Sequence, residues 1–337
     1  MTRRMLGRLA NPQLLALVGV LLINWLLFPS FFRVTWQDGR LFGSVIDVLN
    51  RGAPVAILSI GMVGVIATKG VDLSVGAVMA VAGAVAASLV VAGYPAPVAV
   101  IAALLVGLLC GLWNGFLVAV LDIQPIVATL VLMVAGRGIA QLITQGFIVT
   151  FNDPLLIFIG TGSFLGLPMA TVIALVLLVL VTLLVRKTAI GLFIEAVGVN
   201  RAAASLAGIR SRMLLILVYA LSGLCAAIAG IIVAGDIRGA DANNAGLWLE
   251  LDAILAVVIG GTSLLGGRFS VPLAVVGALI IQAMNTGILV SGFPPEFNLI
   301  VKAGMIILIL LIQSPLATRI APRRPQRARI GVQRTAK

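Results

Sequence analysis

Long apolar runs, separated by short polar or proline-containing turns, recur along this chain of 337 residues. A helix needs about 20 apolar residues to cross a bilayer, and inside hydrocarbon a helix satisfies its own backbone polar groups. The composition agrees: 61% of the residues are hydrophobic and 10% are charged, whereas soluble domains carry about 25% charged residues. We therefore predict an all-α, polytopic membrane protein.

Ten segments are predicted to cross the membrane. The eighth is shorter than a full span, is interrupted by Gly260-Gly261 and ends at Gly266-Gly267, so we expect a short or broken helix there. One transmembrane domain is expected over residues 1–315, followed by a basic, flexible tail over residues 316–337. The predicted spans are residues 13–28, 53–68, 75–92, 98–121, 126–143, 169–185, 213–235, 253–265, 270–290 and 299–312.

Most of the 23 basic residues fall on one predicted side of the membrane. Ten spans place both termini and the loop 186–212 on that side, with Lys69 and Arg268, whereas most acidic residues fall on the other side. Lys and Arg are enriched in cytoplasmic loops, so both termini and this loop are predicted to be cytoplasmic. The net charge of +12 is thus explained by basic residues that fix the orientation of the chain in the membrane. The sequence shows no pattern of a nucleic-acid-binding module.

The loop 186–212 is the longest polar interval inside the apolar part of the chain. Asn200 is a favourable N-cap, residues 201–207 form helices readily, and Gly208 can adopt the left-handed conformation that ends a helix. We predict a short helix here, through which a protein outside the membrane could move the spans. The basic residues of this loop are Arg186, Lys187, Arg201, Arg210 and Arg212.

A polar break, KGVDLS, separates the second predicted span from the third. In one interpretation, Asp72 and Ser74 cap the helix that follows. In the other, the break interrupts a discontinuous helix and lines a path for a solute. In the fourth span, Gly107, Gly111 and Gly115 form a stripe of small residues that favours close helix packing, and Asn114 beside it could bond to another helix or face a solute.

Isolated polar residues inside the spans are mostly amides, with few charges. Polar groups at membrane depth usually face protein or a water-filled cavity, although Arg137 or Lys302 could reach an interface instead. Several amides suit a neutral, hydroxyl-rich solute better than an ion. The residues are Asn24, Arg137, Gln141, Gln282, Asn285 and Lys302, and the predicted translocation path comprises Asp72, Ser74, Asn114, Gln282 and Asn285.

The sequence lacks the residues that several kinds of catalytic, metal-binding and ATP-binding sites require. The chain has no histidine and no paired carboxylates within spans, so we predict no catalytic residues, no metal site and no cofactor. It also lacks a G-x-x-x-x-G-K-[ST] motif. If ATP drives transport, another subunit must hydrolyse it.

Blocks of sequence spread over nearly the whole chain after the first span resemble one family. The blocks are Gly70–Ala84 (GVDLSVGAVMAVAGA), Gly111–Leu130, Ala196–Ile209 (AVGVNRAAASLAGI), Leu221–Ala234, Gly239–Gly267 and Val276–Ile288. Together they resemble the inner-membrane permeases of bacterial ABC sugar importers, in the ribose, xylose and galactofuranose group. Lys69 departs from the family, which has a small residue before GVDLS.

The resemblance implies a multi-pass inner-membrane subunit that is not an enzyme and that imports a monosaccharide, galactofuranose or a related sugar, by alternating access. It implies two cytoplasmic ATPases, a periplasmic sugar-binding protein and a second permease as partners, in a lipid bilayer. Galactofuranose systems use two different permeases, so a heterodimer is expected, with a homodimer as the alternative. In this family one loop docks into a groove on the ATPase. It maps here onto Ala196, Val197, Gly198, Asn200, Arg201, Ala202, Ala203, Ala207, Gly208 and Ile209.

Two alternatives stay open on the sequence. The first is a permease of the same superfamily for another solute, such as a nucleoside or a branched-chain amino acid. The second is a secondary transporter or channel, which would work without ATP or a partner.

Overall fold

A computed structural model describes residues 12–37, 39–292, 294 and 296–313 of the protein. The chain divides into two compact units, residues 1–295 and residues 296–337. The described part of the second unit contains a single helix, α14 (Phe297–Gln313). The basic tail predicted over residues 316–337 lies outside the described residues.

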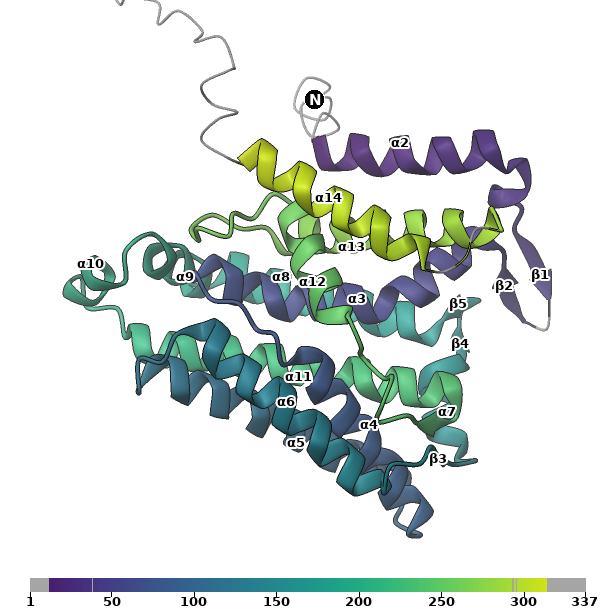
Figure 1. Cartoon of the computed structure of the whole chain (residues 1–337), viewed down its shortest axis with the longest axis horizontal. Helices are drawn as coiled ribbons and strands as arrows, with labels where there is room; N and C mark the ends of the chain where they lie inside the picture. The colour runs from purple at the N-terminus through teal and green to yellow at the C-terminus, as the bar shows by residue number, and fades with distance from the viewer. Residues whose placement is uncertain (1–11, 38, 293, 295, 314–337) are drawn as a thin grey trace, which may run out of the picture. The chain divides into compact units, whose positions relative to one another are not determined.

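Each of the ten predicted spans coincides with a helix (Figure 1). Among the described helices, α3, α5, α6, α8, α11 and α13 are long and apolar enough to cross a membrane, by length and composition. The short eighth span is a helix of 11 residues, α12. The helices in the first unit that match predicted spans are α2 (Pro12–Leu27), α3 (Ser44–Ala67), α4 (Val75–Val91), α5 (Ala96–Ala119), α6 (Pro125–Thr144), α8 (Met169–Lys187), α11 (Ser211–Ile237), α12 (Leu249–Ile259) and α13 (Val271–Val290).

Helix α3 begins at Ser44, well before the predicted start of the second span at Ala53. Its first turns carry polar residues on one exposed face, including Asp47 and Arg51, while Ile46 and Val48 on another face are buried. This amphipathic start conceals the helix from a search for continuous apolar residues.

Short elements join the long helices. Three antiparallel strand pairs form, β1 with β2, β3 with β6, and β4 with β5. The β3–β6 pair connects two segments that are far apart in the sequence, Val149 facing Ala240. Asp153 begins α7 by accepting hydrogen bonds from Leu155 N and Leu156 N at 2.9 and 3.0 Å. These elements are η1 (Pro29–Phe32), β1 (Thr35–Gln37), β2 (Arg40–Phe42), β3 (Val149–Thr150), α7 (Pro154–Thr161), β4 (Ser163–Phe164), β5 (Leu167–Pro168) and β6 (Gly239–Ala240).

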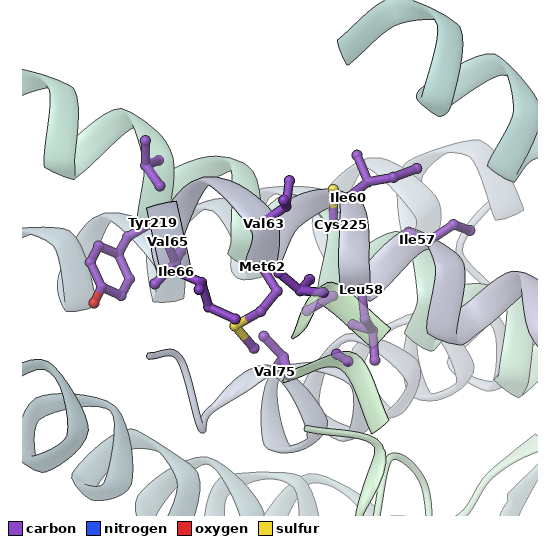
Figure 2. Packing of buried hydrophobic residues seen from close by; sticks show 14 of the residues in the cluster. Ile57, Leu58, Ile60, Met62, Val63, Val65, Ile66, Val75, Tyr219 and Cys225 are labelled. Carbon is purple, nitrogen blue, oxygen red and sulfur yellow. The ribbon is translucent and has the colours of Figure 1, made fainter. Parts of the chain in front are cut away.

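The first unit packs around α3 and α11. In α3, 83% of the most apolar stretch is buried, compared with 22% in α8 and 28% in α5 and in α6. Figure 2 shows side chains of α3 packed with Tyr219 and Cys225 of α11 and Val75 of α4. The exposed apolar surfaces of α5, α6 and α8 are those expected to face lipid or another membrane subunit.

The two ends of this unit carry different short elements. Helices α9 (Ile190–Val199) and α10 (Arg201–Leu206) lie beyond one end of α11, and α7 and β3 lie at the other (Figure 1). We call these the α10 end and the α7 end. Lys69 and Asp122 bond to residues of α9 and α10, whereas Arg40 bonds to the last residue of α7. The turns after α3 and α5 therefore lie at the α10 end and β2 lies at the α7 end, while both chain termini lie outside the described residues.

Candidate functional site

The predicted loop helix is α10, and its capping follows the sequence. The Asn200 side chain accepts a hydrogen bond from Ala203 N at 3.1 Å. Gly208 has a φ of +87° after the helix ends. A second helix, α9, precedes it; the sequence does not predict this helix, because residues 190–199 are too few for a span and lie between basic residues. Of the predicted coupling residues, Ala196, Val197 and Gly198 lie on α9, Arg201, Ala202 and Ala203 on α10, and Ala207, Gly208 and Ile209 in the link to α11.

Arg201 fastens α10 to the turn between α5 and α6. Its Nη1 lies 2.9 Å from Asp122 Oδ1, and its Nη2 donates to Ala119 O at 3.0 Å. Arg201 is therefore engaged within the chain, and the outward surface of α10 consists mainly of small side chains. Leu206 is the exception, because 91% of it is exposed at the end of the helix.

Helix α9 is attached to the last turn of α3. A Cβ on Gly198 would lie 1.9 Å from Ala67 O, so only glycine permits this contact. Gly267 N also donates to Ala67 O, at 2.9 Å. The Lys69 ammonium donates to Val199 O at 3.0 Å and so satisfies a carbonyl at the C-terminus of α9. This contact gives a physical role to Lys69, the residue that departs from the family pattern.

Asp72 is the centre of a buried polar cluster between the α3–α4 break, α5 and α11. Its Oδ1 accepts from Ser74 N at 3.0 Å and from Ser74 Oγ at 2.6 Å, and its Oδ2 accepts from Ser222 Oγ at 2.8 Å. Asn114 Nδ2 donates to Ser74 Oγ at 2.8 Å. The Ser74 side chain makes no capping bond to α4, so the capping interpretation of Ser74 is wrong: its hydroxyl donates to Asp72 instead.

The cluster contains two residues that the sequence did not single out, Ser222 and Tyr219. Asn114 Oδ1 and the Tyr219 hydroxyl are buried without a hydrogen-bond partner among the described residues. The members are at most 1% exposed. In this conformation the cluster is therefore closed to solvent.

Gln282 and Asn285 lie elsewhere. Gln282 Nε2 donates to Thr286 Oγ1 at 3.4 Å within α13, and the Gln282 stem packs beside Gly52 near the start of α3. Gly52 lies about 22 Å from Ala67 along α3, at 1.5 Å per residue. The structure therefore divides the predicted path residues into two separate groups.

The glycine stripe of α5 lies against α11. A Cβ on Gly107 would lie 2.4 Å from Ala227 Cβ, one on Gly111 would lie 2.3 Å from Tyr219 O, and one on Gly115 would lie 2.8 Å from Ile216 Cα. Real Cβ atoms essentially never show such contacts. The two backbones thus approach more closely here than side chains on α5 would allow.

Arg137 and Gln141 of α6 hold the segment that leads into α12. Arg137 Nη1 donates to Ala242 O at 3.0 Å and to Ala245 O at 2.7 Å. Gln141 Nε2 donates to Asn243 Oδ1 at 2.8 Å. Arg137 therefore bonds to protein within the bundle rather than reaching an interface, and the sequence offered no signal that pairs these residues.

Nearby, Asp241 accepts from the Asn244 side chain at 2.8 Å. Within the described residues, no three His, Cys, Asp or Glu side chains gather as a metal site would require.

Known proteins of similar sequence are membrane permeases. The family model described as branched-chain amino acid transport system / permease component matches residues 44–310. The galactofuranose transporter permease protein YtfT of Escherichia coli is 66% identical over 90% of this chain and 89% of its own length. The fructose import permease protein FruF of Bifidobacterium longum is 41% identical over 93% of this chain and 90% of its own.

The ribose import permease protein RbsC of Escherichia coli is 38% identical over 90% of this chain and 93% of its own length. No solved structure matches the chain significantly. The family model covers well over half of the chain, and these three relatives are matched over most of their lengths. The chain therefore belongs to the family of multi-pass membrane proteins described as the permease component of branched-chain amino acid transport systems.

Proposed function

We propose that this chain is the transmembrane subunit of an ABC importer that carries a monosaccharide, galactofuranose or a related sugar, across the bacterial inner membrane. The observation that carries the proposal is 66% identity to a galactofuranose permease over 90% of the chain. Two further relatives are named as fructose and ribose import permeases. The family description names branched-chain amino acids, so a permease of the same superfamily for another solute is the alternative.

The proposed partners are cytoplasmic ATPases, a periplasmic sugar-binding protein and a second permease. The ATPase contact is proposed on α10 and its flanks, residues 196–209. Support comes from the exposure of Leu206 and from small neighbours that leave it prominent on the surface. A protruding leucine among alanines suits insertion into an apolar groove on a partner. The bonds of α10 to the α5–α6 turn would pass a push on α10 into the bundle.

Transport would proceed by alternating access driven by the ATPases. The wild-type chain, reconstituted with ATPases, binding protein and second permease, is expected to take up labelled galactofuranose only when ATP is inside the liposomes. Uptake without ATP or partners would instead establish a secondary transporter. A panel of labelled sugars, nucleosides and branched-chain amino acids identifies the solute.

The docking surface is tested by Leu206→Glu, with Leu165→Glu as the matched control. Leu165 is 86% exposed and belongs to the turn between β4 and β5. Leu206→Glu is expected to abolish co-purification of the ATPase and uptake, because a carboxylate cannot enter an apolar groove without a partner. Leu165→Glu is expected to retain the ATPase. Replacement of residues 200–208 by a Gly/Ser linker should act like Leu206→Glu, and normal uptake in that variant would refute the proposed docking site.

A further inference from the structure

A non-helical segment, residues 241–248, lies deep within the bundle. Its carbonyls at Ala242 and Ala245 accept hydrogen bonds from Arg137. Arg137 is about 18 Å from the first residue of α6, a helix about 30 Å long. Gly246 touches Gly76 at the start of α4, where a Cβ on either residue would meet the other backbone at 2.3–2.4 Å. The segment therefore reaches the middle of α6 and meets the beginning of α4.

Four side chains of this segment, those of residues 243, 244, 247 and 248, are exposed, although its backbone is held by protein. Asn243 and Asn244 are exposed, as is Gln141, which bonds to Asn243. Trp248 is 53% exposed and adopts a φ of +66° at the start of α12. At membrane depth, non-helical backbone and uncharged polar groups are found where they face protein or line water, and not against lipid. This face must therefore meet water or another protein.

The chemistry of the face suits a neutral ring that carries several hydroxyl groups. The amides of Gln141 and Asn243 can both donate to and accept from hydroxyls. Arg137 donates from Nη1 to two backbone carbonyls, and its charge interacts with the carboxylates of Glu250 and Asp241. The Trp248 ring offers an apolar surface against which the C–H face of a sugar can pack, with an indole N–H at its edge.

We propose that Arg137, Gln141, Asn243 and Trp248 form the solute-contacting wall of the translocation path, and that they recognise a neutral, polyhydroxylated ring. The proposal rests on the proposed import function and names the surface of this chain that discriminates the solute. The sequence predicted Asp72, Ser74 and Asn114 as path residues, but these are at most 1% exposed. The residues proposed here to contact the solute instead belong to α6 and to the segment before α12. Glycines at Gly76 and Gly246 allow this wall to lie against α4.

The test compares uptake and ATP hydrolysis in the complete importer in proteoliposomes. Trp248→Ala is expected to lower the rate of galactofuranose uptake at saturating sugar at least about tenfold, the effect of about 1.4 kcal/mol. ATP hydrolysis stimulated by the sugar-loaded binding protein should stay within about twofold of wild type, because the ATPase contact is at the α10 end. Trp248→Phe, which retains a ring, should keep most uptake, as should Trp113→Ala, which removes a tryptophan of α5 that is 52% exposed.

Asn243→Ala and Gln141→Ala provide a second measurement. Each is expected to lower uptake of the sugar relative to that of an analogue lacking one ring hydroxyl, because a lost bond matters only where the hydroxyl is present. Unchanged uptake in Trp248→Ala would overturn the proposal, as would separation of the two permeases in that variant, since the face would then be a protein interface. Failure of the wild-type importer to take up any sugar would refute the proposed function instead.

Discussion

Gly111→Ala tests how closely α5 and α11 must approach. The added Cβ would lie 2.3 Å from Tyr219 O and 2.9 Å from Ala220 Cα. Both are backbone atoms, so no side chain can rotate away, and the 2.3 Å contact must lengthen to at least 3.0 Å. Forcing an extra carbon into a packed interface typically destabilises by about 1–3 kcal/mol.

The separation also affects the buried polar cluster. Asn114 follows Gly111 by three residues and bonds to Ser74 Oγ at 2.8 Å. If α5 moves outward, this bond stretches, and an unsatisfied buried polar group adds about 1–3 kcal/mol. We therefore expect Gly111→Ala to lower the free energy of unfolding by about 2–6 kcal/mol in total.

Gly138→Ala on α6 is the matched control. A Cβ at Gly138 meets nothing within 4 Å, and alanine favours a helix over glycine by about 1 kcal/mol. The measurement is reversible unfolding of the purified chain in mixed micelles, titrated with SDS and followed by tryptophan fluorescence. Gly138→Ala should be as stable as wild type or more stable. If Gly111→Ala and Gly138→Ala differ by less than about 0.5 kcal/mol, the range of an ordinary surface change, the close approach of α5 to α11 is not required.

Two further predictions concern charged groups. In the same titration, Asp72→Ala should destabilise by about 2–4 kcal/mol, because two serine hydroxyls lose their acceptor, and Asp72→Asn should destabilise less; equal effects would contradict this. A double-mutant cycle on Arg201 and Asp122 should yield a coupling of at most about 1 kcal/mol, since the pair is 37% and 63% exposed; a larger value would mean that the pair is shielded from water.

The ten spans could be predicted because hydrophobicity and length are local properties of a sequence. The same is true of α10, where Asn200 and Gly208 mark both ends. Helix α9 and the first turns of α3 are not predicted, for different reasons. Helix α9 is apolar apart from Glu195, but its 10 residues are too few for a span and they lie between basic residues. The first turns of α3 bury Ile46 and Val48 but expose Asp47 and Arg51, so they show no continuous apolar run.

The site was predicted less completely, because it is built from contacts between distant segments. Asp72, Ser74 and Asn114 were each recognisable as polar residues in or beside spans, but Ser222 resembles any small residue of a membrane helix until its bond to Asp72 is seen. Arg137 likewise gave no indication that its acceptors are the carbonyls of Ala242 and Ala245. A backbone carbonyl that accepts a hydrogen bond cannot be recognised from the sequence. The position of a polar residue in a span therefore does not reveal whether its side chain bonds to protein or contacts a solute.

The positions of the two polar groups favour different roles for them. Helix α9 packs against Ala67 at Gly198 and accepts a hydrogen bond from Lys69, and Asp72 lies only a few residues beyond them in the non-helical break. Asp72 in turn bonds to α11 through Ser222. One route by which a displacement of α9 can reach α11 therefore runs through this break and its bonds to Asp72. A closed cluster on that route suits the mechanics of the bundle, whereas the exposed amides near Trp248 suit contact with a solute. One short break between two helices thus lies between the surface proposed to receive ATP-driven motion and the helices that must rearrange around the sugar.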